Sequence, residues 1–197
     1  MGAVWHVAVG WRQEKDPQPG AEGRRGLSYS RGVPELQPLR ADHEGAVLAF
    51  ELANRSYFAG FISDRGDAFF DHFAEQQVQL LAEQEVGEAA YYVLVADDGS
   101  VVGRFNLRDI GHGSAVLGYR VAQHVAGRGV ATAAVEELCR AAAERLGLRV
   151  IHAATSDANV ASQRVLTKAG FVRVRPADPD ELGGKTGSWY EWRPEPS

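Results

Sequence analysis

This chain has a single cysteine and no long hydrophobic run. The lone cysteine, Cys139, excludes a framework of internal disulfides and fits a reducing compartment. No apolar stretch reaches the roughly 18 residues that a membrane-spanning helix needs. The N-terminal stretch MGAVWHVAVGWRQEKD has no cationic region before its short apolar patch, so we expect no secretory signal. These absences predict a cytoplasmic protein without membrane contact.

Charge is distributed unevenly along the chain, whose formal net charge is −5. Residues 40–90 hold three arginines against ten acidic residues, a net charge of −7 for this segment alone. Such an acidic segment disfavours nucleic acid as a partner and modestly favours a cationic one. Two solvated helix faces would explain the same charges equally well.

The 197 residues, 45% of them hydrophobic, suit one domain with a substantial core. Residues 1–33 are rich in Gly, Pro and Arg and lack sustained periodicity, which predicts a disordered tail or an extension outside the fold. Within them, AVWHVAV could pair as a strand. The domain itself is expected to span residues 34–194.

Hydrophobic periodicity and turn residues predict the order β–α–α–β–β–β–α–β–α–β–β. Strands are expected at 35–40, in a hairpin at 91–110, and at 114–122, 148–155, 171–175 and 188–193. Helices are expected at 42–54, with Asp42 as N-cap, at 64–85, with Asp64 or Asp67 as cap, and within 130–146 and 159–170. The pattern predicts an α+β fold with a mixed, mostly antiparallel sheet of about six or seven strands and helices on both faces.

The stretch HVAGRGVATAAV places Gly127, Arg128 and Gly129 directly before a long helix. A helix start leaves N–H groups without partners and carries about half a positive charge from the aligned peptide dipoles. Glycines let a ligand approach the backbone, and Arg128 adds a full charge, so the turn predicts a phosphate site. The spacing fits neither a P-loop nor a Rossmann fingerprint.

Three segments resemble the GCN5-related N-acetyltransferases (GNAT), in particular the branch of the ribosomal-protein N-terminal acetyltransferases. LGYRVAQHVAGRGVATAAV is similar to that family's strand, pyrophosphate loop and helix. NVASQRVLTKAGF is similar to its Asn-x-x-Ser…Leu-x-Lys-x-Gly-Phe run, and VVGRFNL is a weaker third match. The resemblance covers the chain from about Val33 to Arg193. It departs from the family at Ala126, where a Gln or Arg is usual.

The resemblance implies acetyl-CoA as co-substrate and no metal. The pyrophosphate would lie on the N–H groups of the turn and helix start, at Arg128, Gly129, Val130, Ala131, Thr132 and Ala133. Pantetheine would lie along the strand at Arg120, Val121 and Ala122, in the manner of strand addition. Asn159 would cap its helix and hydrogen-bond a pantetheine amide.

Acyl transfer from a thioester needs a neutral amine and a proton for the departing thiolate. The positions where the family often has a glutamate base and a tyrosine acid hold Ala154 and Leu166 here, and neither can act. Ser162 lies one helical turn after Asn159, and the resemblance implies that this serine lies close to the thioester sulfur of the cofactor. Ser162 is therefore the candidate acid, with helix capping or packing as its alternative role. His152, Asp109 and His112 are weaker candidates for the base, and a packed or solvated side chain is the simpler reading of each.

Without an evident base, a weakly basic acceptor is favoured. Neutralising an α-amine of pKa about 7.8 at pH 7 costs about 1 kcal/mol, whereas a lysine of pKa about 10.4 costs about 4.6 kcal/mol. Cys139 lies on the apolar stripe of its helix, so we expect it to be a core residue rather than an acyl carrier.

The resemblance implies that the segment from Ala53 to Phe70 walls the acceptor pocket, and its polar side chains Asn54, Arg55, Tyr57 and Asp64 are the predicted contacts. A loop that packs on itself is an equal alternative for this segment. The predicted function is an acetyl-CoA-dependent N-acetyltransferase acting on a protein N-terminal amine or a small amine. A non-catalytic acyl-CoA-binding module is the alternative, and the oligomeric state is left open.

Overall fold

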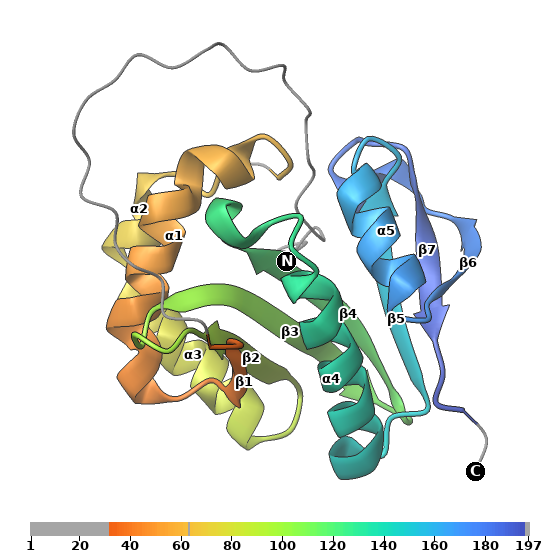
Figure 1. The fold of residues 1–197 in the computed structure, drawn as a ribbon, viewed down its shortest axis with the longest axis horizontal. Coiled ribbons are helices and arrows are strands. Elements are labelled where there is room, and N and C mark those ends of the chain that lie inside the picture. The colour runs from red at the N-terminus through yellow and green to blue at the C-terminus, as the bar shows by residue number, and fades with distance from the viewer. Residues whose placement is uncertain (1–31, 63, 196–197) are drawn as a thin grey trace.

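The computed structural model describes residues 32–62 and 64–195, which form a seven-stranded sheet with helices on both faces (Figure 1). The predicted tail falls almost entirely outside these residues, so its assignment as an extension remains a prediction. The strands are β1 (Glu35–Pro38), β2 (Ala90–Val95), β3 (Val101–Gly111), β4 (Ser114–Val121), β5 (Val150–Ser156), β6 (Val172–Pro176) and β7 (Gly187–Trp192). The helices are α1 (Glu44–Ala59), α2 (Asp67–Asp71), α3 (Phe73–Glu85), α4 (Val130–Leu146) and α5 (Val160–Lys168).

The sheet has the strand order β1-β2-β3-β4-β5-β7-β6, and every neighbouring pair is antiparallel except β4–β5. This arrangement confirms the predicted α+β class and the order of elements. β1 lies at one edge of the sheet, where Pro38 is tolerated because proline has no N–H to donate to a second neighbouring strand.

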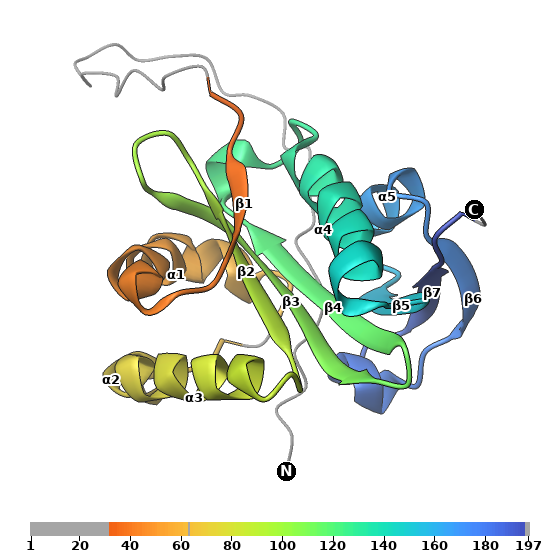
Figure 2. The same cartoon turned by 90° about the horizontal axis from the view of Figure 1, so that it is seen from below.

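The helices form two layers, one on each face of the sheet. Helices α1, α2 and α3 cover one face, and α4 and α5 cover the other (Figures 1 and 2). Val47 of α1 and Leu138 of α4 are fully buried against these two faces. In the part of the chain that the structure describes, no helix is both long and apolar enough to cross a membrane.

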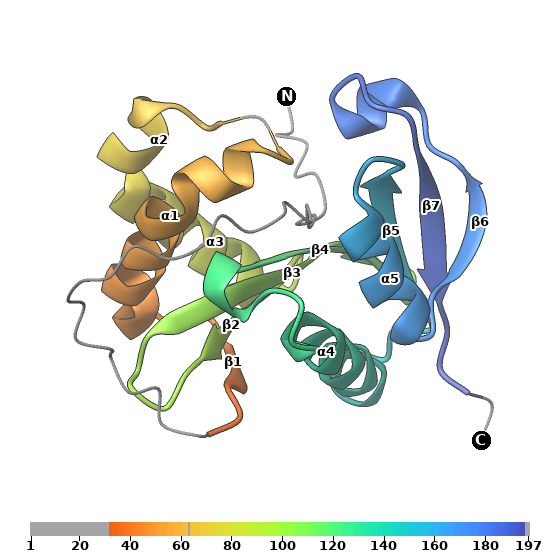
Figure 3. The same cartoon turned by 45° about the horizontal axis from the view of Figure 1, so that its top comes forward.

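The sheet opens between β4 and β5. These two strands pair only over Ser114–Val116 and Val150–His152, next to the β3–β4 turn. Beyond these paired residues the two strands separate, so that β1–β4 and β5–β7 form two diverging parts of the sheet (Figure 3). The gap-facing backbone of β4 therefore has no strand beside it.

The predicted caps of the first two helices are wrong. Asp42 lies in a single turn of 3-10 helix before α1, the residue at the N-cap is His43, and the Asp42 carboxylate is bonded to Arg40. The second helix is interrupted at His72 and begins after Gly66, which has a φ of 75° and no side chain to cap with. Asp64 and Asp67 instead bind Arg55, because a guanidinium offers each carboxylate a stronger partner than a helix N–H group.

Candidate active site

The turn before α4 has the geometry of an anion site. Gly127 and Gly129 have φ values of 75° and 80°, in the left-handed region that glycine adopts without strain. The N–H of Ala133 donates to the C=O of Gly129 at 3.0 Å, which leaves the preceding N–H groups of the first turn outside the helical ladder. A Cβ added at Gly129 would meet nothing within 4 Å, and the Arg128 side chain beside it is exposed.

Strand β4 presents part of its backbone to the gap. The N–H of Ala122 donates to the C=O of Val102 at 2.8 Å, toward β3. Because N–H and C=O directions alternate along a strand, those of Val121 and Tyr119 point the other way, toward β5. Of the three residues predicted to line pantetheine, Val121 is thus the one whose main-chain groups face the gap.

The start of α5 brings a serine hydroxyl to the opposite wall of the gap. Asn159 is the N-cap, as predicted, and its Oδ1 accepts a hydrogen bond from the N–H of Ser162 at 3.1 Å. The Ser162 side chain is therefore not the cap. Its Oγ lies 3.1 Å from the Tyr119 Oη, and both residues are buried.

Tyr119 is a site residue that the sequence analysis missed. Its position on β4 predicts only a packed aromatic ring, and it does stack on Phe105 with the ring planes 9° apart. The contact with Ser162 joins residues 43 positions apart in the sequence, so no local pattern could reveal it. Burial raises the pKa of the Tyr119 phenol well above its usual range, so this hydroxyl keeps its proton at neutral pH.

The weaker candidates for a base have other surroundings. Asp109, at an irregularity near the end of β3, and His112, in the β3–β4 turn, have φ values of 54° and 52°. Both lie near the paired end of β4 and β5. The His152 Nδ1 lies 3.6 Å from the Glu191 Oε1, at the last residue pair between β4 and β5. Ala154 and Leu166 are buried, as small and aliphatic side chains are expected to be. Among the described residues no cluster of His, Cys, Asp and Glu could hold a metal ion.

Polar residues in the last turns of α1 bind the start of α2 and the turn before α4. Arg55 binds Asp64 at 2.7 Å and Asp67 at 2.6 Å. The amide of Asn54 donates to Phe50 C=O and accepts from the N–H of Gln123, so it ties α1 to the turn before α4. These contacts favour the self-packed loop for both residues.

Tyr57 differs from the other predicted acceptor contacts. Its hydroxyl is buried without a hydrogen-bond partner among the residues that the structure describes, and burial raises its pKa. Its ring packs edge-on against Phe61, with 5.5 Å between the ring centroids. Tyr57 therefore has a buried hydroxyl that hydrogen bonds within the described residues leave unsatisfied.

Beneath α1 lies a buried cluster of charges that the sequence analysis did not anticipate. The Glu51 Oε1 accepts from Arg104 at 2.7 Å and from Arg120 at 2.5 Å, and all three side chains are almost fully buried. Burial raises the pKa of Glu51, but Arg120 and Arg104 outweigh it, so the pKa lies below its usual range. The Arg120 side chain thus links β4 to α1 through Glu51.

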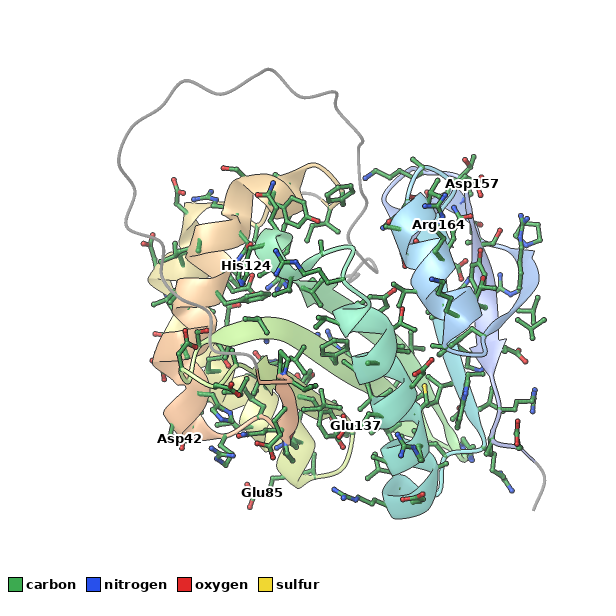
Figure 4. All side chains as sticks on the ribbon, in the orientation of Figure 1. Asp42, Glu85, His124, Glu137, Asp157 and Arg164 are labelled. Carbon is green, nitrogen blue, oxygen red and sulfur yellow. The ribbon has the colours of Figure 1, made fainter. Side chains whose placement is uncertain are left out.

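Side chains of both halves of the molecule surround the opening. Figure 4 shows His124 on the α1 side of it, and Asp157 and Arg164 on the α5 side. The Lys185 ammonium, before β7, spans the two halves and donates to the C=O of Phe61, after α1, at 2.6 Å. The geometry places an anion site at the start of α4 and a hydroxyl pair between β4 and α5, beside the opening in the sheet.

Comparison with known proteins identifies this arrangement. Residues 35–172 match the family described as acetyltransferase (GNAT) domain. A probable N-acetyltransferase of Bacillus subtilis, YjcK, is 28% identical over 145 residues, which are 69% of this chain and 78% of that protein.

Two solved structures have the same fold. The ribosomal-protein-S5-alanine acetyltransferase of Vibrio fischeri superposes with a TM-score of 0.77 at 19% identity, over 86% of this chain and 98% of its own. RimJ of Mycobacterium smegmatis, in complex with a CoA-disulfide, superposes with a TM-score of 0.74 at 25% identity, over 83% of each chain.

Proposed function

The chain belongs to the GNAT acetyltransferase family, and we propose that it transfers the acetyl group of acetyl-CoA to the α-amine at a protein N-terminus. That it is an acetyl-CoA-dependent N-acetyltransferase follows from the family. The choice of an N-terminal amine is supported by the structural neighbours, of which one acetylates a ribosomal-protein alanine.

The cofactor site is supported by three features beside the opening in the sheet. The N–H groups of Val130, Ala131 and Thr132 would bind the pyrophosphate, with Arg128 supplying the charge that Ala126 lacks. The gap-facing N–H and C=O of Val121 would bind pantetheine as an added strand would. Asn159, already engaged as a cap through Oδ1, retains its NH₂ group for a pantetheine carbonyl.

The hydroxyl pair supplies the proton that the leaving group needs. The amine nitrogen bonds to the thioester carbonyl carbon, the carbon–sulfur bond breaks, and Ser162 gives its proton to the thiolate. The proton lost by the amine passes to water and from there restores the serine hydroxyl. Tyr119, which stays protonated, fixes the orientation of Ser162 through their 3.1 Å contact.

Charge on the acceptor side favours an α-amine over a polyamine. Arg104 and Arg120 share one carboxylate, Glu51, on the α1 side of the opening. The net positive charge of these two arginines and one glutamate repels acceptors that carry several positive charges. It also lowers the pKa of an amine that binds there. Both effects help an amine whose pKa is already low.

A non-catalytic acyl-CoA-binding module is the second candidate, because Ala154 and Leu166 replace the residues that often handle protons in this family. The Ser162–Tyr119 contact is the observation that favours the enzyme.

The two candidates can be separated by CoA release. Peptides beginning with a free Ser or Ala should release CoA, whereas the same peptides with a blocked N-terminus, and spermidine, should stay near the rate without acceptor. Tight acetyl-CoA binding with background turnover for every amine would establish the module instead.

A further inference from the structure

Two adjacent residues of β4 face opposite sides of the sheet. Tyr119 points toward α5, where its hydroxyl meets Ser162. Arg120 contacts Glu51 of α1, so Gly118, two residues before it, faces the α1 side. The gap between β4 and β5 connects these two faces at this point. The leaving thiolate and the attacking amine can thus occupy opposite sides of one strand.

The α1-side face is hollow at Gly118. A Cβ built on this residue would meet nothing within 4 Å, although the residue lies in a central strand of the sheet. Its φ is not in the left-handed region, so the backbone does not need glycine here. The backbone at Gly118 would accept any residue. A glycine at such a position in a central strand indicates that a ligand approaches the backbone closely.

Asn106 borders this hollow. It is the cross-strand partner of Gly118 on β3, so its side chain lies beside the open space on the same face. Its Oδ1 is buried and has no hydrogen-bond partner in the described part of the chain. A buried acceptor without a donor destabilises a fold, so its presence in a native structure calls for an explanation.

The surroundings of Asn106 define what can donate to it. Arg104 and Arg108 lie two residues away on either side, on the same face of β3, and Arg120 is the cross-strand partner of Arg104. Arg65, before α2, interacts electrostatically with all three of these arginines. Tyr91 is the partner of Asn106 on β2, and its hydroxyl donates to Glu83 of α3. An amide oxygen next to these guanidinium groups favours a neutral N–H donor over an ammonium ion. The acyl-transfer reaction requires an amine in this protonation state.

We propose that the acceptor amine binds over Gly118 on the α1-side face, with one N–H donated to the Oδ1 of Asn106. The site rests on the proposed N-acetyltransferase function. This position directs the nitrogen lone pair toward the β4–β5 gap. From the other face, Ser162 protonates the departing thiolate and Tyr119 orients Ser162. Asn106 holds the nucleophile in its neutral form, and Gly118 leaves the room it needs.

Gly118→Ala tests the hollow. The methyl group enters open space at an ordinary φ, so the melting temperature and the KM for acetyl-CoA should stay unchanged. The KM for a peptide with a free N-terminal Ser should rise at least tenfold. Gly111→Ala is the matched control, because its Cβ also meets nothing within 4 Å and it lies at the far end of β3. It should leave both KM values unchanged.

Asn106→Asp tests the hydrogen bond without altering shape. A carboxylate at this position favours the protonated amine, so the acidic limb of the kcat/KM profile for the peptide should move to higher pH by about one unit or more. Asn106→Ala should raise the peptide KM about tenfold and leave the pH profile in place.

Each outcome decides one question. Wild-type KM values for Gly118→Ala together with an unshifted profile for Asn106→Asp would overturn the amine site while leaving the acetyltransferase intact. Absence of turnover by the wild-type chain with any amine would instead remove the proposed function. A fall in the melting temperature of Gly118→Ala would contradict the open space on which the site depends.

Discussion

At the scale of single residues, the proposed acid catalysis depends on the contact between the hydroxyls of Ser162 and Tyr119. Ser162 follows the N-cap Asn159 by three residues, and the sequence alone leaves both acid catalysis and capping open. The cap is Asn159, because its Oδ1 binds the N–H of Ser162. The Ser162 hydroxyl is directed instead to Tyr119, which no local pattern connects with it.

Ser162→Ala should therefore lower kcat by about 10²-fold, the low end for a general acid, since a thiolate is a good leaving group. The KM for acetyl-CoA should stay nearly constant, because the proton transfer is used only in the transition state. Loss of the contact with Tyr119 should cost about 1 kcal/mol of stability.

Asn159→Ala is the comparison for Ser162→Ala, because it removes the cap and should cost about 1 kcal/mol of stability while retaining the acid. Steady-state kinetics and thermal melts on the two variants separate the roles. A Ser162→Ala enzyme with wild-type kcat would show that water protonates the thiolate.

Cys139 illustrates a residue whose role the sequence does predict. It is fully buried on α4, and burial raises the pKa of its thiol to about 12. We expect it to react with an aromatic disulfide reagent only after unfolding in guanidinium, and Cys139→Ala to keep wild-type kcat. Rapid modification of the native enzyme accompanied by loss of activity would contradict this.

At the scale of elements, the sequence predicts those ends that glycine determines. Gly129 and Gly147 flank α4 as expected, each with a positive φ. The starts of α1 and α2 are missed because Asp42, Asp64 and Asp67 have arginine partners, and those partners depend on tertiary structure. Leu52 of α1 is 52% exposed although it is apolar, because the buried face of this helix is formed by Val47, Phe50 and Phe58.

The N-terminal turn of α4 can be tested by Gly129→Val. Its φ of 80° strains any β-branched residue, and its side chain would occupy the open space where the pyrophosphate is proposed to lie. The KM for acetyl-CoA should rise at least tenfold, measured at saturating peptide.

Gly147→Val, at the other end of the same helix, is the control, since its φ is 65° and its Cβ also meets nothing within 4 Å. It should lose comparable stability and leave the KM unchanged. Equal KM values for the two variants would attribute the effect to strain alone.

At the scale of the whole molecule, the sequence predicts the order of elements but not the space between them. Hydrophobic periodicity reveals β4 and β5 as strands, yet it contains no information on where their pairing stops. The pairing ends at Val116 and His152, and the hydroxyls of Tyr119 on β4 and Ser162 on α5 meet beside the opening beyond it. Asn106 and Tyr119 belong to the site only through this assembly, which is why sequence reasoning did not find them.

Binding of the cofactor across this opening should be visible by amide hydrogen exchange. The proposed site makes two separate demands, that α4 bind phosphate and that β4 accept pantetheine as a strand. Adenosine 3′-phosphate 5′-diphosphate carries the pyrophosphate and adenosine of CoA without pantetheine, so it should slow exchange at Val130, Ala131 and Thr132 and nowhere on β4. CoA should protect the same amides and, in addition, the gap-facing N–H of Val121, because pantetheine forms hydrogen bonds with it.

Exchange measured residue by residue at saturating concentrations of each ligand compares the two patterns directly. The N–H of Ala122, already bonded to Val102, serves as the internal reference and should exchange slowly with or without ligand. Protection by CoA that is confined to α4 would contradict the proposed binding of pantetheine along β4 and support the anion site alone. Protection on β4 alone would do the reverse, since the helix start would then have no phosphate to bind.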